Sequence, residues 1–415
     1  MNKSYKTNFL GGLFFISIIF SFIFLEDSLG GARHDFLFHE KFIILFAEDF
    51  KNTFNNYGQG ELFARDSPIF YIFLSLLYKI GLSLDSIRFL NILSIPLLLY
   101  IFTDCLSFQF KNINKNLLIL TSFIIFLSPT IRSLVVWPYP NLYGLILFLF
   151  SIKFFLSFNK EKKGRLGEAL KNILFLALAS YITPNFSVFV IFFLYKFFFK
   201  LKNLSHFIFI VIFNLLLATP AIIYYFINDF YLFNVTVSGA DLNLKLNIFN
   251  KIIIISTLVF FYFIPFIDNK IIKNTQNVLK NFYKEYVLIL FFFICVYFFN
   301  FPYGNFGGGI FFHFSQNFFE NNFLLFSVFA LSLILFKSAK LINLSNIILF
   351  SCLVFYNMQV SIYHKYFDPL LLFVFLFLLN RNEIKSQKIY LELIKKYYFL
   401  YIFFLGISFY KVYFL

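Results

Sequence analysis

Acidic and histidine side chains gather in one short segment of an otherwise apolar chain. Asp35 precedes His39 by four residues, so in a helix the two side chains share one face. Arg33, His34 and Glu40 flank the pair. A carboxylate at this place can act as a general base, helped by a divalent cation (Mg²⁺ or Mn²⁺) held with His34, His39 and Glu40. The alternative is that these residues are only the solvated start of an amphipathic helix.

Cationic side chains suited to a phosphate lie further along the chain. Arg88 and Arg132 each lie at the expected outer end of a membrane span, where a cation is costly unless it is paired. His364, Lys365 and Tyr366 follow at a late outer turn, where they can donate hydrogen bonds to a phosphate. Snorkelling of the two arginines to the interface is the alternative, and one Lys beside one His is a short motif.

The rest of the chain has the composition of a bilayer protein. Of its 415 residues, 60% are hydrophobic and 13% are charged, and the apolar runs reach the length of about 20 residues that crosses a hydrocarbon core. This composition excludes a soluble globular protein. The net charge of +15 is explained by lysine-rich cytoplasmic loops, so no nucleic-acid partner is expected. The 3 cysteines have neither the spacing of a disulfide framework nor that of a zinc site.

The positions of Lys and Arg predict the topology. They cluster at every second connection, and placing these clusters inside gives about 12 to 13 transmembrane helices with a cytoplasmic N-terminus and an outer C-terminus. The first span is retained, because no small-residue cleavage site follows it. Trp137 and Tyr139 are expected in an interfacial aromatic belt. The expected spans are residues 9–25, 88–108, 117–134, 141–158, 168–184, 186–199, 206–227, 252–267, 286–302, 323–336, 342–358, 368–380 and 398–414.

One long connection, residues 26–87, remains outside and contains two apolar pieces that do not span. The piece 35–55 carries several charges, each of which costs about 2.5–3.5 kcal/mol at mid-bilayer, so a helix in the interface is expected. The second piece starts with a Ser67 cap and Pro68 in the first turn, and Gly81 ends it. The sequence therefore predicts an all-α, polytopic single membrane domain with two juxtamembrane helices and no separate soluble domain.

Together these features resemble the polytopic GT-C glycosyltransferases, a group that includes protein O-mannosyltransferases and lipid A aminoarabinose transferases. Members share a first span and a long outer loop with an acidic catalytic residue and two juxtamembrane helices, and Asp35 stands at the acidic position. The resemblance covers roughly residues 9–200 and 340–380. Its other segments are Ser67–Tyr71 for a Pro-Pro-x-Tyr-Tyr helix, Ser83–Asn91 with Arg88 for the second span, and Lys365-Tyr366 with Pro369 for a late turn.

The resemblance implies transfer of a sugar from a polyprenyl-phosphate donor to a glycan, lipid or protein acceptor, at the outer face of a bacterial inner membrane. Asp35 would take the proton from an acceptor hydroxyl with inversion at the sugar. Arg88, Arg132, His364 and Lys365 would stabilise the phosphate as it leaves, and apolar grooves between the spans would hold the prenyl chain.

Other functions remain open. A transporter or flippase of lipid-linked glycans predicts inverted repeats and paired broken helices, which the sequence does not display, and the charges gather at one face. A polymerase or ligase of such glycans is an enzyme alternative, although that class tends to place its large outer loop late in the chain. A purely structural membrane protein would leave the early acidic loop unexplained.

Overall fold

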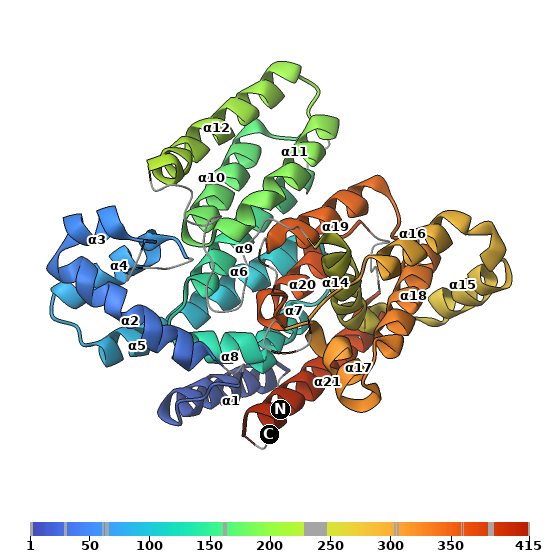
Figure 1. Ribbon diagram of the computed structural model, residues 1–415, viewed down its shortest axis with the longest axis horizontal. Helices are drawn as coiled ribbons and strands as arrows, with labels where there is room; N and C mark the ends of the chain where they lie inside the picture. Colours follow the sequence, from blue (N-terminus) through green and yellow to red (C-terminus); the bar gives the residue numbers. More distant parts are fainter. Residues whose placement is uncertain are drawn as a thin grey trace. The chain divides into compact units, whose positions relative to one another are not determined.

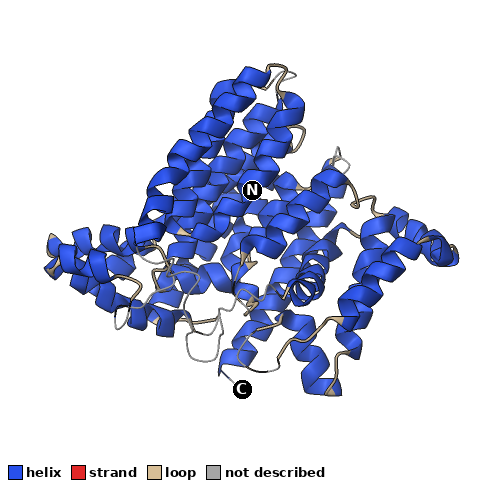
Figure 2. Ribbon diagram, turned by 45° about the horizontal axis from the view of Figure 1, so that its top comes forward, coloured by secondary structure: helices blue, strands red, loops and turns tan. Residues whose placement is uncertain are grey.

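The structure of the protein is a computed structural model. It describes residues 3–413 apart from 29–30, 60–61, 63–65, 161–163, 228–246, 303, 305–306, 358, 360 and 381–385. Over these residues the secondary structure is helical and contains no strand, only an isolated bridge between Gly307 and Ile362 (Figure 2). The predicted all-α class is therefore confirmed.

The chain divides into two compact units. Unit 1 consists of Met1–Leu232 together with Ile384–Leu415, and unit 2 is Phe233–Glu383. The C-terminal helix belongs to unit 1 because its tyrosines bond to an early helix. Tyr390 Oη lies 2.9 Å from Thr121 Oγ1, and Tyr398 Oη donates to the Leu120 carbonyl at 2.6 Å. The prediction of one membrane domain without a soluble domain stays a prediction.

Unit 1 holds the first helices of the chain and the last one. In it α9, α10 and α12 pack in succession, and α2 packs on α4 (Figure 1). Its elements are α1 (Lys3–Ile23), α2 (Ala32–Glu48), α3 (Phe50–Asn56), α4 (Pro68–Lys79), α5 (Leu84–Asn91), α6 (Ser94–Gln109), α7 (Lys115–Ser122), η2 (Phe123–Leu127), α8 (Pro129–Val136), α9 (Pro140–Lys160), α10 (Leu166–Ile182), η3 (Pro184–Val188), α11 (Phe189–Lys200), α12 (Leu204–Ile227) and α21 (Gln387–Tyr413).

Unit 2 is built around one buried helix, α14, which contacts α16, α17, α18, α19 and α20. Between α14 and α16 runs α15, an amphipathic helix with no buried residue that packs along α18. The elements of unit 2 are α14 (Ile248–Phe263), η4 (Ile264–Phe266), α15 (Asn269–Lys280), η5 (Phe282–Lys284), α16 (Tyr286–Tyr297), α17 (Gly309–Phe319), α18 (Phe323–Ser338), α19 (Leu344–Tyr356), η6 (His364–Tyr366), α20 (Leu370–Phe373) and η7 (Val374–Leu378).

Several described helices can cross a membrane, as a multi-pass protein requires. Five are long and apolar enough: Leu84–Gln109, Pro140–Lys160, Leu204–Ile227, Ile248–Phe266 and Gln387–Val412. A sixth candidate is a broken pair, Lys115–Leu127 and Pro129–Val136, which meet at 70°.

These five or six spans are fewer than the about 12 to 13 that the lysine pattern predicted. The expected span 117–134 contains a break that apolar run length did not reveal, where Pro129 follows Ser128 and interrupts the helix. The boundary at Pro184 agrees with the expected end of span 168–184. The remaining apolar segments form shorter helices, including Phe9–Ile23, Phe323–Ser338 and Leu344–Tyr356.

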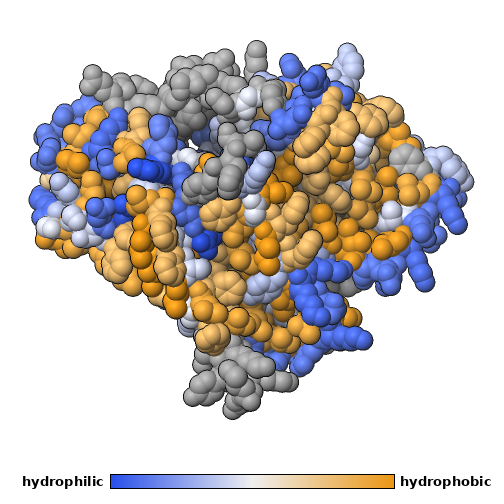
Figure 3. All heavy atoms as spheres, turned by 90° about the horizontal axis from the view of Figure 1, so that it is seen from below, coloured by the Kyte–Doolittle hydropathy of each residue, from blue (hydrophilic) through white to orange (hydrophobic). Residues whose placement is uncertain are grey.

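Large apolar side chains cover much of the outer surface. In α12 only Ile210 is buried, and α16 leaves Leu290 and Phe293 exposed among many others. Figure 3 shows hydrophobic residues over wide areas of the face that it displays. Apolar surface on this scale marks contact with lipid or another apolar partner.

The two helical pieces expected between residues 26 and 87 form where the sequence predicts them. The charged piece 35–55 folds as α2 and α3, and the second piece is α4. Ser67 Oγ accepts a hydrogen bond from the Ile69 amide at 3.4 Å, so the predicted cap and the Pro68 start are confirmed. Aromatic side chains of these helices share a small core.

Candidate functional site

The start of α2, which carries Asp35, is fixed by a carboxylate. Asp27 Oδ2 accepts hydrogen bonds from the amides of Gly31 at 2.8 Å and Arg33 at 3.3 Å, and its Oδ1 accepts from Ala32 at 3.1 Å. A negative charge at a helix N-terminus satisfies otherwise unbonded amides and is favoured by the helix dipole. These hydrogen bonds hold the first turn of α2 in place, and with it the backbone of Asp35.

Asp35 and His39 share a face of α2, and this face meets α4. His39 is buried, its Nε2 lies 3.7 Å from Asp66 Oδ2, and its ring stacks on Tyr71 at 5.2 Å between centroids. Tyr71 Oη donates to the same Asp66 oxygen at 3.2 Å. Burial, together with the charge of Asp66, raises the pKa of Tyr71 well above its usual value, so this hydroxyl stays a donor. We call Asp35, His39, Asp66 and Tyr71 the acid–histidine cluster.

The residues expected to share a metal ion point in different directions. His34 is exposed, His39 faces Asp66, and Glu40 lines a pocket on another face of α2. Among the described residues, no three His, Cys, Asp or Glu side chains gather in a way that would hold a metal ion. His34, His39 and Glu40 therefore do not fit a common metal site, and the chemistry proposed below relies on none.

An open pocket of about 780 Å³ lies on the other face of α2. Apolar residues such as Phe36 form part of its wall. We call it the arginine pocket, and its polar and aromatic lining includes Arg33, Glu40, Tyr78, Asp85, Arg88 and Trp137.

Two guanidinium groups of the arginine pocket lie against the same indole ring. Arg88 Cζ is 3.9 Å from the centroid of Trp137, and Arg33 Cζ is 5.6 Å from it. Arg88 Nε donates to the Val136 carbonyl at 3.3 Å, and its Nη1 donates to the exposed Asp85 at 2.8 Å. Its Nη2 is buried and bonds to no group in the described part of the chain. Both cations line the same pocket and would favour an anion there.

Trp137 differs from its expected place in an interfacial belt. It is only 3% exposed, and its Nε1 donates to the Glu26 carbonyl at 3.0 Å. The residue is a buried support on which Arg88 lies. Burial of this kind depends on contacts far apart in sequence, so apolar patterning did not reveal it.

Arg132 is not placed to bind a lipid phosphate. Its Nε and Nη2 donate to the two carboxylate oxygens of Glu26 at 2.7 and 2.6 Å, and both residues are buried. Nη2 also donates to Ser21 Oγ at 2.6 Å. Burial alone would raise the pKa of the Glu26 carboxyl, but the hydrogen bonds and charge of Arg132 outweigh it, and that pKa is lowered. The sequence-based role of Arg132 is therefore replaced by a structural ion pair.

His364, Lys365 and Tyr366 form η6 in unit 2. There His364 lies within hydrogen-bond distance of a tyrosine. Its Nε2 lies 3.0 Å from Tyr262 Oη, which in turn donates to Asp368 Oδ1 at 3.0 Å. Burial lowers the pKa of His364 to about 3, which favours a neutral ring over the predicted cationic donor.

The other two residues of η6 are half-buried, as His364 is. Lys365 Nζ lies 5.5 Å from the ring of Tyr363. Their predicted role in phosphate binding stays a prediction.

Lys251 is a potential functional residue that the sequence argument missed. It lies in the first turn of α14, is 2% exposed, and its Nζ donates to the Asn357 carbonyl at 2.6 Å. The expected span begins at residue 252 and leaves Lys251 just outside it. Its position could have marked it as functional, because lysines favour the cytoplasmic side and Lys251 lies at the expected outer end of a span.

Comparison of the chain with protein-family models, curated proteins and solved structures gives no match. Function is therefore inferred from the residues and their geometry.

Proposed function

We propose that the protein transfers a sugar from a polyprenyl-phosphate donor to an acceptor hydroxyl at the outer face of a bacterial inner membrane. The observation that supports this proposal best is the pair of guanidinium groups, Arg33 and Arg88, on the Trp137 indole in an open pocket. Such a pair suits a phosphate diester, which carries a negative charge and gains another when it leaves. The surrounding apolar helices suit a lipid-linked substrate.

In the proposed reaction Asp35 takes the proton from the acceptor hydroxyl. The acceptor oxygen bonds to the anomeric carbon of the sugar as the bond from that carbon to the phosphate oxygen breaks, with inversion. The polyprenyl phosphate leaves with both bonding electrons, and Arg88 and Arg33 stabilise its added charge. No protonation of the leaving group is required.

Two carboxylates of α2 compete for the role of base. Asp35 lies in the acid–histidine cluster, whereas Glu40 lies in the arginine pocket with Arg88. We propose Asp35, because His39 lies on the same face of α2 and Asp66 contacts His39, so that both can position an acceptor. The different faces make the two residues separable by mutation.

The test compares Asp35→Asn, Glu40→Gln and Arg88→Lys in the native host, expressed at the wild-type level in a deletion strain. Glu48→Gln is the matched control, because Glu48 lies exposed at the end of α2 and outside both sites. Mass spectrometry of envelope glycans and lipid-linked sugars should show one sugar missing and its donor accumulating in Asp35→Asn and Arg88→Lys. If Glu40→Gln alone reproduces the deletion, Glu40 is the base. If all three variants match wild type, the transferase proposal fails.

A flippase of lipid-linked glycans is the second candidate, favoured by the 70° break between η2 and α8. Broken helices at mid-membrane are a mark of transporters. Purified protein in detergent, given a labelled donor and an acceptor extract, separates the two. Transfer of the label without any membrane gradient or compartments supports the enzyme, since a flippase moves its substrate and leaves it unchanged.

A further inference from the structure

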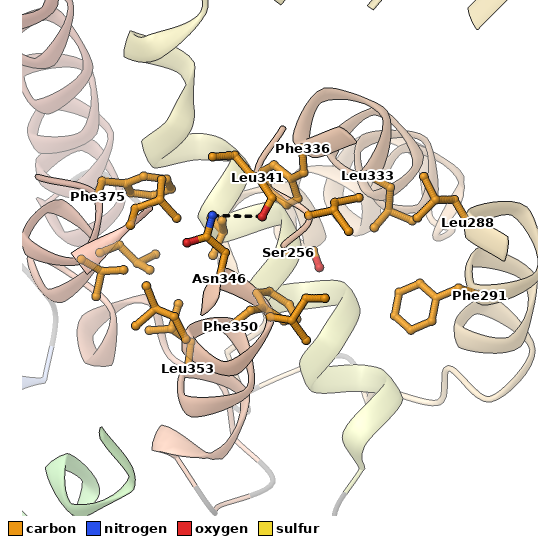
Figure 4. Close-up of a pocket in the computed structure, with 17 residues that line it drawn as sticks. Ser256, Leu288, Phe291, Leu333, Phe336, Leu341, Asn346, Phe350, Leu353 and Phe375 are labelled. Atoms are coloured by element: carbon orange, nitrogen blue, oxygen red, sulfur yellow. Dashed lines mark hydrogen bonds between the residues drawn. The ribbon is translucent and has the colours of Figure 1, made fainter. Parts of the chain in front are cut away.

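Unit 2 contains a second pocket, of about 300 Å³, whose wall is almost entirely hydrocarbon. Figure 4 shows Leu288 and Phe291 of α16 facing Ser256 of α14 and Phe350 of α19 across the open space. The amide of Asn346 also borders it, but its Nδ2 is occupied by the carbonyls of Leu341 and Asn380, each at 3.0 Å. A polar ligand would find few partners here, whereas an apolar one fits.

The size of the pocket suits one hydrocarbon chain. An apolar cavity of about 150 Å³ holds a single benzene ring, so the volume of this pocket, about 300 Å³, accommodates roughly ten carbons of an acyl chain. If left empty, the pocket would deprive its wall of dispersion contacts. A chain that enters from the bilayer supplies those contacts.

The pocket opens on the lipid-facing surface of unit 2. Phe291, Ile342 and Ile347 belong to its wall and are also exposed, so the same side chains border the pocket and the apolar outer surface. An acyl chain can therefore enter sideways from the membrane without crossing a polar rim.

Lysines stand at one end of this pocket. Lys337 follows Phe336 and Lys340 precedes Leu341, and both Phe336 and Leu341 line the pocket. Lys337 Nζ pairs with Glu285 at 3.0 Å, while no carboxylate pairs with Lys340 in the described structure. The pair leaves net positive charge at the mouth, where an anionic headgroup would complement it.

The amphipathic helix α15 marks this end as the membrane surface. Asn274 Nδ2 donates to the Ser338 carbonyl at 3.2 Å, which holds α15 beside the turn that carries Lys337 and Lys340. The helix adds Lys270, Lys273 and Lys280, and none of its residues is buried. A basic amphipathic helix of this kind lies in the headgroup region, so the lysines are at the depth of a lipid phosphate.

We propose that unit 2 binds one anionic phospholipid, with an acyl chain in the apolar pocket and the headgroup phosphate against Lys337 and Lys340. This site is separate from the acid–histidine cluster and the arginine pocket, which both belong to unit 1. The proposal does not depend on the proposed transferase activity. It requires both parts of the site: the cavity selects a lipid chain, and the lysines select the charge of its headgroup.

The test uses the full-length protein, delipidated in mild detergent, and native mass spectrometry with phosphatidylglycerol or phosphatidylcholine of the same chains. We expect wild type to prefer phosphatidylglycerol by roughly tenfold or more, since each lysine near the surface contributes to attraction of anionic lipid. Lys337→Gln with Lys340→Gln should bind both lipids equally. Lys388→Gln with Lys411→Gln, which removes the same charge from α21, should keep the preference.

A pocket-filling variant tests the cavity itself. Ser256→Phe places a ring in the space and should lose both phospholipids, and Ser256→Leu replaces it if thermal unfolding shows that the larger residue prevents folding. Equal binding of the two lipids by wild type would overturn the proposal, and so would full binding by a folded filled variant. A polyprenyl phosphate that displaces phosphatidylglycerol at equal concentration would instead assign the pocket to a prenyl chain.

Discussion

Arg132 and Glu26 form a bidentate ion pair with donor–acceptor distances of 2.7 and 2.6 Å, although 106 residues separate them in sequence. The pair ties the segment after α1 to α8, the second arm of the broken helix pair. Trp137 bonds to the carbonyl of the same Glu26, and Arg88 lies on Trp137. The ion pair therefore supports Trp137, which lines the arginine pocket, while Arg132 and Glu26 do not line it.

Replacing Glu26 by Gln should destabilise unit 1. The change leaves the buried guanidinium of Arg132 without its counter-charge, and breaking one side of a buried pair costs about 3–5 kcal/mol. Thermal unfolding in detergent should show a clearly lower midpoint for Glu26→Gln than for wild type. Glu168→Gln is the control, because the Lys171 partner of Glu168 is well exposed and surface pairs contribute at most about 1 kcal/mol. Equal midpoints for Glu26→Gln and Glu168→Gln would contradict the assignment.

The same ion pair predicts a pH dependence with a definite sign. The pKa of Glu26 is lowered below its ordinary value of 4.5 in the folded protein. Its contribution to stability is then present above that value and is lost as pH falls through the lower, folded-state pKa. The difference in unfolding midpoint between wild type and Glu26→Gln should stay constant from neutral pH to about pH 5 and shrink below it. A difference that grows toward low pH would refute this.

Replacing the Asn91 side chain by a smaller or a charged one should lower the stability of the protein. Its Nδ2 donates at 2.8 Å to the carbonyls of both Leu134 and Val135, and its Oδ1 accepts from Tyr143 at 2.8 Å. Asn91→Ala should cost about 1–3 kcal/mol, since buried carbonyls lose their donor. Asn91→Asp should cost more, because a carboxylate would face those two carbonyls.

Unfolding midpoints of the two Asn91 variants measure this order directly. Asn56→Asp serves as the matched control, because Asn56 lies exposed at the end of α3. We expect it to unfold close to wild type. Should Asn91→Asp prove as stable as Asn56→Asp, the hydrogen bonds of Asn91 would contribute no stability.

Lys251 should be needed for activity more than for folding. A buried ammonium is expensive, so Lys251→Met, which keeps the length of the side chain, should unfold at the same temperature as wild type or higher. If Lys251 serves an anionic substrate, the variant should still lose transfer in the detergent assay, and Lys251→Arg should retain part of it. A fully active Lys251→Met protein would show that the lysine is dispensable.

The local parts of the fold could be predicted from the sequence. Ser67 and Pro68 start α4 as predicted because capping depends on residues only two or three positions apart. The shared face of Asp35 and His39 follows from helical periodicity in the same way. Both signals are contained within one turn of helix.

The partners of the arginines could not be predicted, because they depend on how distant helices pack. Nothing near Arg132 in sequence indicates that its counter-charge is Glu26, and Arg88 gives no sign that it lies on Trp137. Both arginines had the same sequence signal, a cation at a span end, yet one is closed in an ion pair and the other borders an open pocket. Only tertiary packing separates the two cases.

The break between η2 and α8 also constrains the parity of the membrane crossings. A segment that enters the bilayer and leaves on the same side adds no crossing, so every later helix end would change sides. The expected topology keeps the lysine-rich ends in the cytoplasm. If α7 and α8 together fail to cross, that expectation requires a second segment of the chain that also fails to cross.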